Sequence, residues 1–190
     1  VKDVIFEGAV AFKPKQLAKV IETRRRWWLS WITGSGVLKD DVFEEDREKL
    51  AEFYRNAGYI DFEIKEWKFE QVDPKRITVR FILFEGRQYK VGAVALKGNT
   101  LFQTEEILQG SPVEGKISKP EMIAGQTFTP RGLTHDQEAI RDFYGAKGYI
   151  DTRVAAQKSA NTETGNIDLT YQIEEKDKSF IEKIEIKGNV

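Results

Sequence analysis

The sequence has no cysteine, and it contains one histidine and one methionine in 190 residues. Without cysteine there is no disulfide framework, no thiolate metal site and no cysteine redox chemistry. His135 is the only imidazole, and no set of nucleophile, base and orienting residue can be assembled around it. Its neighbours Thr134 and Asp136 favour a place at the start of a helix. The sequence therefore gives little support to an enzyme, and it implies no metal and no cofactor.

An excess of charge of either sign is also missing. The formal net charge is −1 and the isoelectric point is about 6.1, so the chain has no field that would attract nucleic acid or an anionic membrane. Long apolar runs are missing too. The longest uncharged stretch, residues 27–38, is interrupted by two glycines and is shorter than the roughly 20 residues that a spanning helix needs. These absences leave binding to other proteins as the main class of function.

What the sequence does contain is an internal repeat with a fixed offset. Gly8, Gly98 and Gly188 each close a short apolar run, and they are spaced 98 − 8 = 188 − 98 = 90 residues apart. The pattern FYxxxGYID occurs at residues 53–61 and again at 143–151. A unit of this length can bury a small core of its own. We therefore predict a tandem array with boundaries at 1–87, 88–177 and 178–190, the last being the first strand of a further domain or a tail.

Each copy has the pattern of one strand, two helices and two further strands. Alternating apolar residues predict a first strand before each repeated glycine, and apolar residues at helical spacing predict the two helices. Two more alternating runs follow, separated by turn-forming residues. The fold class is thus α+β, a tandem β-α-α-β-β arrangement. The predicted final strands are 60–69 and 77–84 around a turn at 72–75, and 150–158 and 167–173 around a turn at 161–166.

The second helix of each copy carries a start signal and a stop signal. Asp41 with Glu44, and Thr134 with Gln137, have the spacing of a capping box. A glycine that ends the apolar stripe predicts a left-handed residue just after the helix. The glycines to which we assign structural roles are Gly8, Gly58, Gly98, Gly148 and Gly188.

The element order, the period and the glycine motifs together resemble polypeptide-transport-associated (POTRA) domains. The resemblance covers the whole chain and is greatest to the middle domains of BamA-type outer-membrane β-barrel assembly proteins. The two copies would then correspond to the third and fourth of five such domains. The motifs that carry the resemblance are WW at 27–28, FYxxxGY at 53–59, EGxxY at 85–89, and GN at 98–99 and 188–189.

This resemblance implies a three-stranded mixed sheet with two helices on one face and the strand order first, third, second. Residues 62–69 and 152–158 would then form exposed sheet edges, whose unpaired N–H and C=O groups can accept an extended client segment as a further strand. The family implies a periplasmic scaffold for β-barrel assembly and insertion into the outer membrane. Its partners would be unfolded outer-membrane proteins, accessory lipoproteins and the membrane barrel domain of the same full-length chain.

The edge of the first unit contains a change of phase. Phe62 and Ile64 alternate on one face, whereas Trp67 and Phe69 have the opposite parity. One extra residue at 65–66 would return all four to the core face, which predicts a β-bulge. The alternative is that Trp67 and Phe69 lie on the outer face. The residues predicted to bind a client are Phe62, Glu63, Ile64, Lys65, Glu66, Trp67 and Lys68.

Three tryptophans form a second candidate. Trp27, Trp28 and Trp31 stand within five residues of one another. They can fold back onto the second helix or form a contact patch for a partner, and the sequence leaves both interpretations open.

Two other functions fit parts of the pattern. The same module could serve a two-partner secretion or organelle-import transporter, where the client is a dedicated passenger. A β-α-α-β order also occurs in KH domains, which bind nucleic acid through a GXXG loop. Here the segment between the helices carries Gly34-Ser35-Gly36 instead, and we expect no nucleic-acid partner. A protein-binding scaffold accounts for the array, the near-neutral charge and the missing chemistry together.

Overall fold

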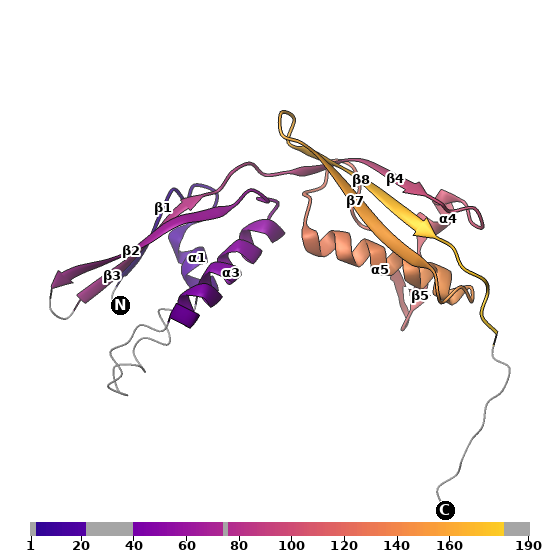
Figure 1. The fold of residues 1–190 in the computed structure, drawn as a ribbon, viewed down its shortest axis with the longest axis horizontal. Coiled ribbons are helices and arrows are strands. Elements are labelled where there is room, and N and C mark those ends of the chain that lie inside the picture. Colours follow the sequence, from indigo (N-terminus) through magenta and orange to yellow (C-terminus); the bar gives the residue numbers. More distant parts are fainter. Residues whose placement is uncertain (1–2, 22–39, 74–75, 181–190) are drawn as a thin grey trace, which may run out of the picture. The chain divides into compact units, whose positions relative to one another are not determined.

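The chain forms two units of the same plan, Val1–Tyr89 and Lys90–Val190 (Figure 1). The computed structural model describes residues 3–21, 40–73 and 76–180. The first unit contains β1 (Asp3–Glu7), α1 (Pro14–Val20), α3 (Asp40–Asn56), β2 (Glu63–Asp73) and β3 (Arg76–Phe84). The second contains β4 (Lys90–Lys97), α4 (Thr104–Gln109), β5 (Ser111–Val113), β6 (Lys116–Ser118), α5 (Pro130–Ala146), β7 (Arg153–Asn161) and β8 (Asn166–Glu174).

Each unit is built on a three-stranded mixed sheet. In the first, the strand order is β1-β3-β2, with β1 parallel and β2 antiparallel to β3. In the second, the order β4-β8-β7 repeats the same directions. The α+β class and the order first, third, second are thus confirmed. One consequence is that β2 and β7 each pair on one side only among the described strands.

The core of the first unit lies between its sheet and the described helices α1 and α3. β3 directs alternate residues, Val79, Phe81 and Leu83, to one buried face. Leu17 of α1 and Leu50 of α3 pack against this face and are completely buried. Both helices therefore cover the same side of the sheet, as Figure 1 shows. Among the described elements, no helix covers the opposite face and no strand pairs with the outer side of β2.

Both predicted capping boxes are wrong, because the helices begin earlier than expected. α3 already includes Asp41, and α5 already includes Thr134. Thr129 caps α5 instead, since its hydroxyl oxygen accepts a hydrogen bond from the Gly132 N–H at 2.9 Å. Pro130 follows in the first helical position, where its missing N–H costs no hydrogen bond. The Thr-Pro pair was the true start signal.

The first strand of each unit ends at a glycine that no other residue can replace without strain. Gly8 and Gly98 have φ angles of +85° and +86°. A Cβ atom on Gly8 would lie 2.3 Å from the Leu83 carbonyl oxygen, and one on Gly98 would lie 2.1 Å from that of Ile173. The chain passes this close to the last strand because glycine has no side chain. Gly188 lies outside the described residues.

The segment that leaves each unit is tied to the end of the second helix. Tyr89 N–H donates to the Gly58 carbonyl, and Ser179 N–H donates to the Gly148 carbonyl, both at 2.9 Å. Gly58 and Gly148 have φ angles of +91° and +93°, in the left-handed region that the sequence predicts. The Tyr89 hydroxyl also donates to Asp61 at 2.8 Å. Each unit thus holds its own exit segment through the same backbone contact.

Candidate functional site

The candidate site is the outer edge of β2. β3 pairs with one side of β2 from Glu63 to Asp73, and no strand pairs with its other side among the residues that the structure describes. The strand begins later than the predicted residue 60. Phe62 therefore precedes β2 and is a core residue, only 4% exposed, rather than an edge residue. The remaining predicted client-binding residues, 63–68, do lie in the strand.

The predicted bulge is present at Lys65. Ile64 is paired with Leu83 and Glu66 with Ile82, so Lys65 has no partner position on β3. The register then places Trp67 opposite Phe81, a residue of the core face. A bulge adds local twist and interrupts the ladder, which protects an edge from uncontrolled pairing.

Charged side chains run along this edge. The Lys65 ammonium contacts Glu63, and Lys68 Nζ lies 3.1 Å from a Glu66 oxygen. All four side chains are about half exposed, so these ion pairs add little stability. Their effect is to place alternating charge beside the free N–H and C=O groups, which disfavours permanent association with another edge.

An apolar surface lies next to these charges. Trp67 is 37% exposed, and the Arg47 guanidinium of α3 lies 5.4 Å from the centre of its ring. Arg47 also donates two hydrogen bonds to the Glu44 carboxylate, at 2.9 and 3.0 Å. The helix thereby holds a flat aromatic and guanidinium surface beside the strand. A client on the β2 edge would find both main-chain partners and an apolar contact here.

The edge of β7 differs from that of β2 in its register and in the hydrogen bonding of its outer side. Its register with β8 runs without a shift from Arg153 to Asn161, so it has no bulge. The Gln137 side chain of α5 donates to the Val154 carbonyl at 3.1 Å. Gln137 stands ninety residues after Arg47, which makes no such contact with β2. One acceptor of β7 is therefore already satisfied within its own unit, and β2 is the better candidate.

A carboxylate at the end of the last strand holds each unit together. In the first unit, Glu85 accepts hydrogen bonds from the Val10 and Ala11 N–H groups at 3.0 and 3.1 Å and from the Tyr54 hydroxyl at 2.8 Å. It thus joins β3, the loop after β1 and α3. Burial and then the bond to Glu85 raise the pKa of Tyr54 well above its usual range. The tyrosine therefore stays protonated and remains a donor.

The same set of hydrogen bonds recurs in the second unit, ninety residues later. Glu175 accepts from the Thr100 and Leu101 N–H groups, both at 3.0 Å, and from the Tyr144 hydroxyl at 2.7 Å. Partial burial raises the pKa of Glu175, but the hydrogen bonds from Thr100, Tyr144 and the backbone outweigh it and lower that pKa overall. Glu85 and Glu175 stand ninety residues apart in the sequence. Their role could not be predicted, because it depends on the loop and the helix meeting at the end of the strand.

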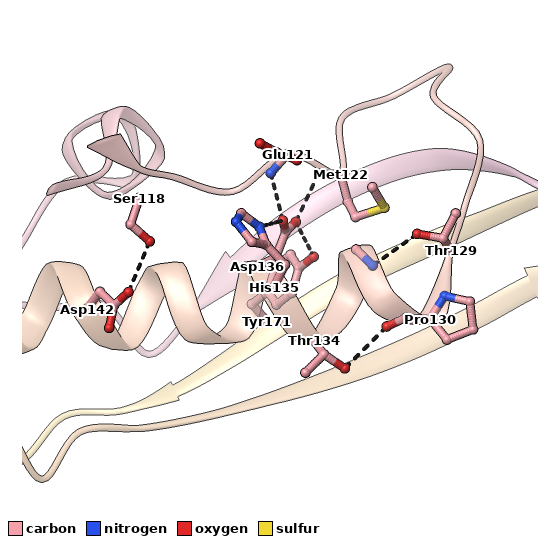
Figure 2. A network of polar contacts seen from close by, with 11 residues as sticks. Ser118, Glu121, Met122, Thr129, Pro130, Thr134, His135, Asp136, Asp142 and Tyr171 are labelled. Atoms are coloured by element: carbon pink, nitrogen blue, oxygen red, sulfur yellow. Dashed lines mark hydrogen bonds and ion pairs between the residues drawn. The ribbon is translucent and has the colours of Figure 1, made fainter. Parts of the chain in front are cut away.

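A fully buried carboxylate of α5 holds the segment between the two helices of the second unit. Asp136 of α5 is fully buried and accepts hydrogen bonds from the Glu121 and Met122 N–H groups, at 2.6 and 3.0 Å (Figure 2). The Tyr171 hydroxyl of β8 donates to it at 2.6 Å. His135 lies beside this carboxylate, with Nδ1 3.6 Å from an oxygen of Asp136. His135 thus lies in the second turn of α5 and not in the capping turn that the sequence predicts, because the helix begins at Pro130.

Asp136 fixes the segment between the two helices of the second unit. That segment forms the β5–β6 hairpin, and the Ser118 hydroxyl at its end donates to Asp142 at 3.0 Å, as Figure 2 shows. Farther on, the Val91 N–H donates to the Gln126 carbonyl at 2.8 Å. The glycine-rich segment therefore packs on α5 and covers the start of the β4 edge. No pattern in the sequence indicated this hairpin.

The remaining candidates are placed as follows. Trp27, Trp28 and Trp31 lie outside the described residues. Within the described ranges, no group of three or more His, Cys, Asp or Glu residues could hold a metal ion. Over those same ranges, no helix has the length and apolar character required to cross a membrane.

Comparison with known proteins assigns the family. The POTRA family model, described as a surface antigen variable number repeat, matches residues 1–86 and 89–176. The chain is 26% identical over 189 residues to the outer membrane protein assembly factor BamA of Nitratidesulfovibrio vulgaris, covering 100% of this chain and 23% of that protein. It is also 26% identical to BamA of Neisseria meningitidis over 190 residues, with the same two coverages. The chain thus spans about a quarter of the length of these curated relatives.

A solved structure shows the same fold. The crystal structure of POTRA domains 3–5 of BamA from Haemophilus influenzae superposes with a TM-score of 0.57 at 18% identity. The match covers 90% of this chain and 64% of that one. The repeated mixed sheet, the repeated glycines and the two family-model matches agree. The chain therefore belongs to the POTRA family, and its two units are POTRA domains similar to those of BamA.

Proposed function

We propose that this chain is the periplasmic part of an outer-membrane protein and that it binds unfolded outer-membrane proteins during their assembly into the membrane. The similarity to BamA, an assembly factor, supports the assembly role. We further propose that accessory lipoproteins and a membrane barrel domain of the same full-length chain are its partners. In this role the chain is a binding scaffold and not an enzyme.

The proposed mechanism is strand addition at β2. The observation that carries it is an edge strand whose outer side has no pairing strand among the described residues and whose bulge and charges limit permanent pairing. Main-chain hydrogen bonds are independent of the client's side chains, so one edge can serve many clients. The Trp67 ring, held beside the Arg47 guanidinium, supplies a neighbouring aromatic contact. Binding should therefore be broad and reversible.

Site-specific crosslinking tests the location. A photoreactive residue is placed at Lys65 or Lys68 of β2, and the control positions are Lys15 and Lys19, which are exposed on α1. A urea-unfolded outer-membrane barrel protein is then diluted into the mixture. We expect crosslinks from β2 and few from α1. Crosslinks that come equally from α1, or none from β2, would show that β2 is not the site.

A peptide experiment tests the mechanism independently. A client-derived strand peptide is compared with the same peptide N-methylated at alternate residues, which keeps its side chains but removes main-chain donors. Strand addition predicts that methylation abolishes binding and that the unmodified peptide slows amide exchange at every second residue of β2. Equal affinity of the two peptides would contradict strand addition while leaving the location of the site intact.

A further inference from the structure

A pair of phenylalanine rings recurs at the same place in both units. In the first unit, Phe12 and Phe53 meet edge to face with their ring centres 4.8 Å apart. In the second, Phe102 and Phe143 do so at 5.3 Å. Each pair joins the loop before the first helix to the long helix, and the members are ninety residues apart. The two units therefore allow a direct comparison of the groups that contact the outer faces of these rings.

In the second unit a cation lies over the rings. The Lys147 ammonium is 5.2 Å from the centre of Phe102 and 4.8 Å from that of Phe143. Lys147 is the residue at the end of α5, where its backbone N–H bonds to the Tyr144 carbonyl. Phe143 is only 3% exposed. The lysine thus fills this position from within its own unit, at a distance typical of a cation–π contact.

The first unit lacks this lysine. Ala57 stands at the equivalent position, and an open groove with a volume of about 450 Å³ lies above the rings. Phe12 and Phe53 line it together with Val20 of α1. Phe53 is half-buried, in contrast to Phe143. Among the described residues, the same aromatic pair therefore faces an open groove where its duplicate lies under a lysine.

We propose that this groove binds a lysine or arginine side chain of a partner protein, in the position that Lys147 occupies in the second unit. The rings attract a cation, and the methylene groups of such a side chain suit the apolar wall. Lys49 and Glu52 also line the groove with opposite charges, so the aromatic faces and the apolar wall are what select the side chain, and Glu52 is the one carboxylate among the lining residues that can accept its charge. The groove is formed by α1, α3 and the loop between β1 and α1, with no residue of β2. The proposal is thus independent of strand addition.

The test uses the whole 190-residue chain and two short capped peptides. One peptide carries a lysine between two leucines, and the other carries norleucine in its place. Ring signals of Phe12 and Phe53 are followed by NMR as each peptide is added. We expect the lysine peptide to bind about two- to fivefold more tightly, the range of an exposed cation–π contact. Equal dissociation constants for the two peptides would overturn the proposal.

Two reciprocal substitutions identify the groove. Ala57→Lys supplies an internal cation, and the preference for the lysine peptide should fall to about one. Lys147→Ala removes the cation of the second unit, and a lysine preference should then appear at Phe102. A preference that survives Ala57→Lys, or none at Phe102 after Lys147→Ala, counts against the proposal. Glu52→Gln, at an exposed position, should weaken the binding of the lysine peptide and leave that of the norleucine peptide unchanged. This second variant keeps the test valid if Ala57→Lys fails to fold.

Discussion

Single carboxylates connect the parts of each unit at the residue scale. Glu85 and Glu175 each bind a loop and a helix tyrosine at the point where the last strand ends. Asp136 does the same for a hairpin segment and a strand tyrosine. Each carboxylate accepts hydrogen bonds from several elements, so it is fully satisfied only when those elements are in place at once. Such residues make the folding of a small unit more cooperative.

The lowered pKa of Glu175 predicts a pH dependence. In the unfolded chain the carboxylate has an ordinary pKa near 4.5, and in the folded unit the pKa is lower. Its contribution to stability is therefore fully present above about pH 4.5 and is lost as the pH falls through the lowered pKa. Glu175→Gln should destabilise the second unit at pH 7 and much less at pH 3. Hydrogen exchange at Thr100 and Leu101 measures this, and a pH-independent difference would contradict it.

The glycine at the end of the first strand predicts a large cost of substitution. Gly98→Ala should destabilise the second unit by about 1 kcal/mol or more, because φ is +86° and the new Cβ would meet the Ile173 carbonyl oxygen. Gly145 of α5 is the matched control, since a Cβ there has no atom within 4 Å. Gly145→Ala should be neutral or stabilise by up to about 1 kcal/mol. Denaturant unfolding followed by NMR distinguishes the two, and similar effects would refute the argument.

Residue-level prediction from the sequence succeeded where a role depends on local periodicity. Tyr54 and Tyr144 lie on the apolar stripe of the second helix of each unit, which indicates a core position, and both are completely buried. The role of Asp136 depends on a hairpin that packs on α5 and on a tyrosine from β8. These contacts join positions far apart in the chain. No local pattern indicates them.

The bulge determines the behaviour of β2 at the scale of elements. Because Lys65 is the unpaired residue, its deletion should leave Ile64 and Trp67 on the core face and produce a regular strand. We expect the deletion to preserve the fold and to increase self-association, since a regular edge pairs more readily. Analytical ultracentrifugation measures the association.

The equivalent deletion in β7 is the control. Ala155 stands ninety residues after Lys65 in a strand without a bulge, so its deletion should turn Ala156 and the rest of that face away from the core. The second unit should then lose stability. If the Lys65 deletion destabilises the first unit as much as the Ala155 deletion destabilises the second, Lys65 is not dispensable in the way that the register indicates.

Element-level prediction was accurate for strand order, the bulge and the repeated helix ends. It failed at helix starts and in residues 110–132. A change of parity is visible in the sequence because apolar residues mark it. The β5–β6 hairpin has only three residues in each strand, and its exposed Val113 and Ile117 give no alternating apolar pattern to detect. Its position comes from contacts with α5.

The molecule as a whole has two separate cores. Leu50 and Ile140 are equivalent residues of α3 and α5, and each is completely buried in its own unit. Leu50→Ala should destabilise the first unit by about 2–5 kcal/mol and leave the second intact, and Ile140→Ala should do the reverse. All four tryptophans lie in the first unit, so fluorescence follows it alone, while NMR follows the second. A single joint transition in both variants would show that the units do not fold separately.

The backbone contacts from Tyr89 to Gly58 and from Ser179 to Gly148 have a consequence for how the number of domains can change in evolution. In each unit, the hydrogen bond that fixes the C-terminal segment is made within that unit. This contact therefore does not depend on which domain follows in the sequence. Gene segments of ninety codons could then be gained or lost by unequal crossing-over with every junction still intact. Such exchange would change the number of domains while keeping each domain's fold.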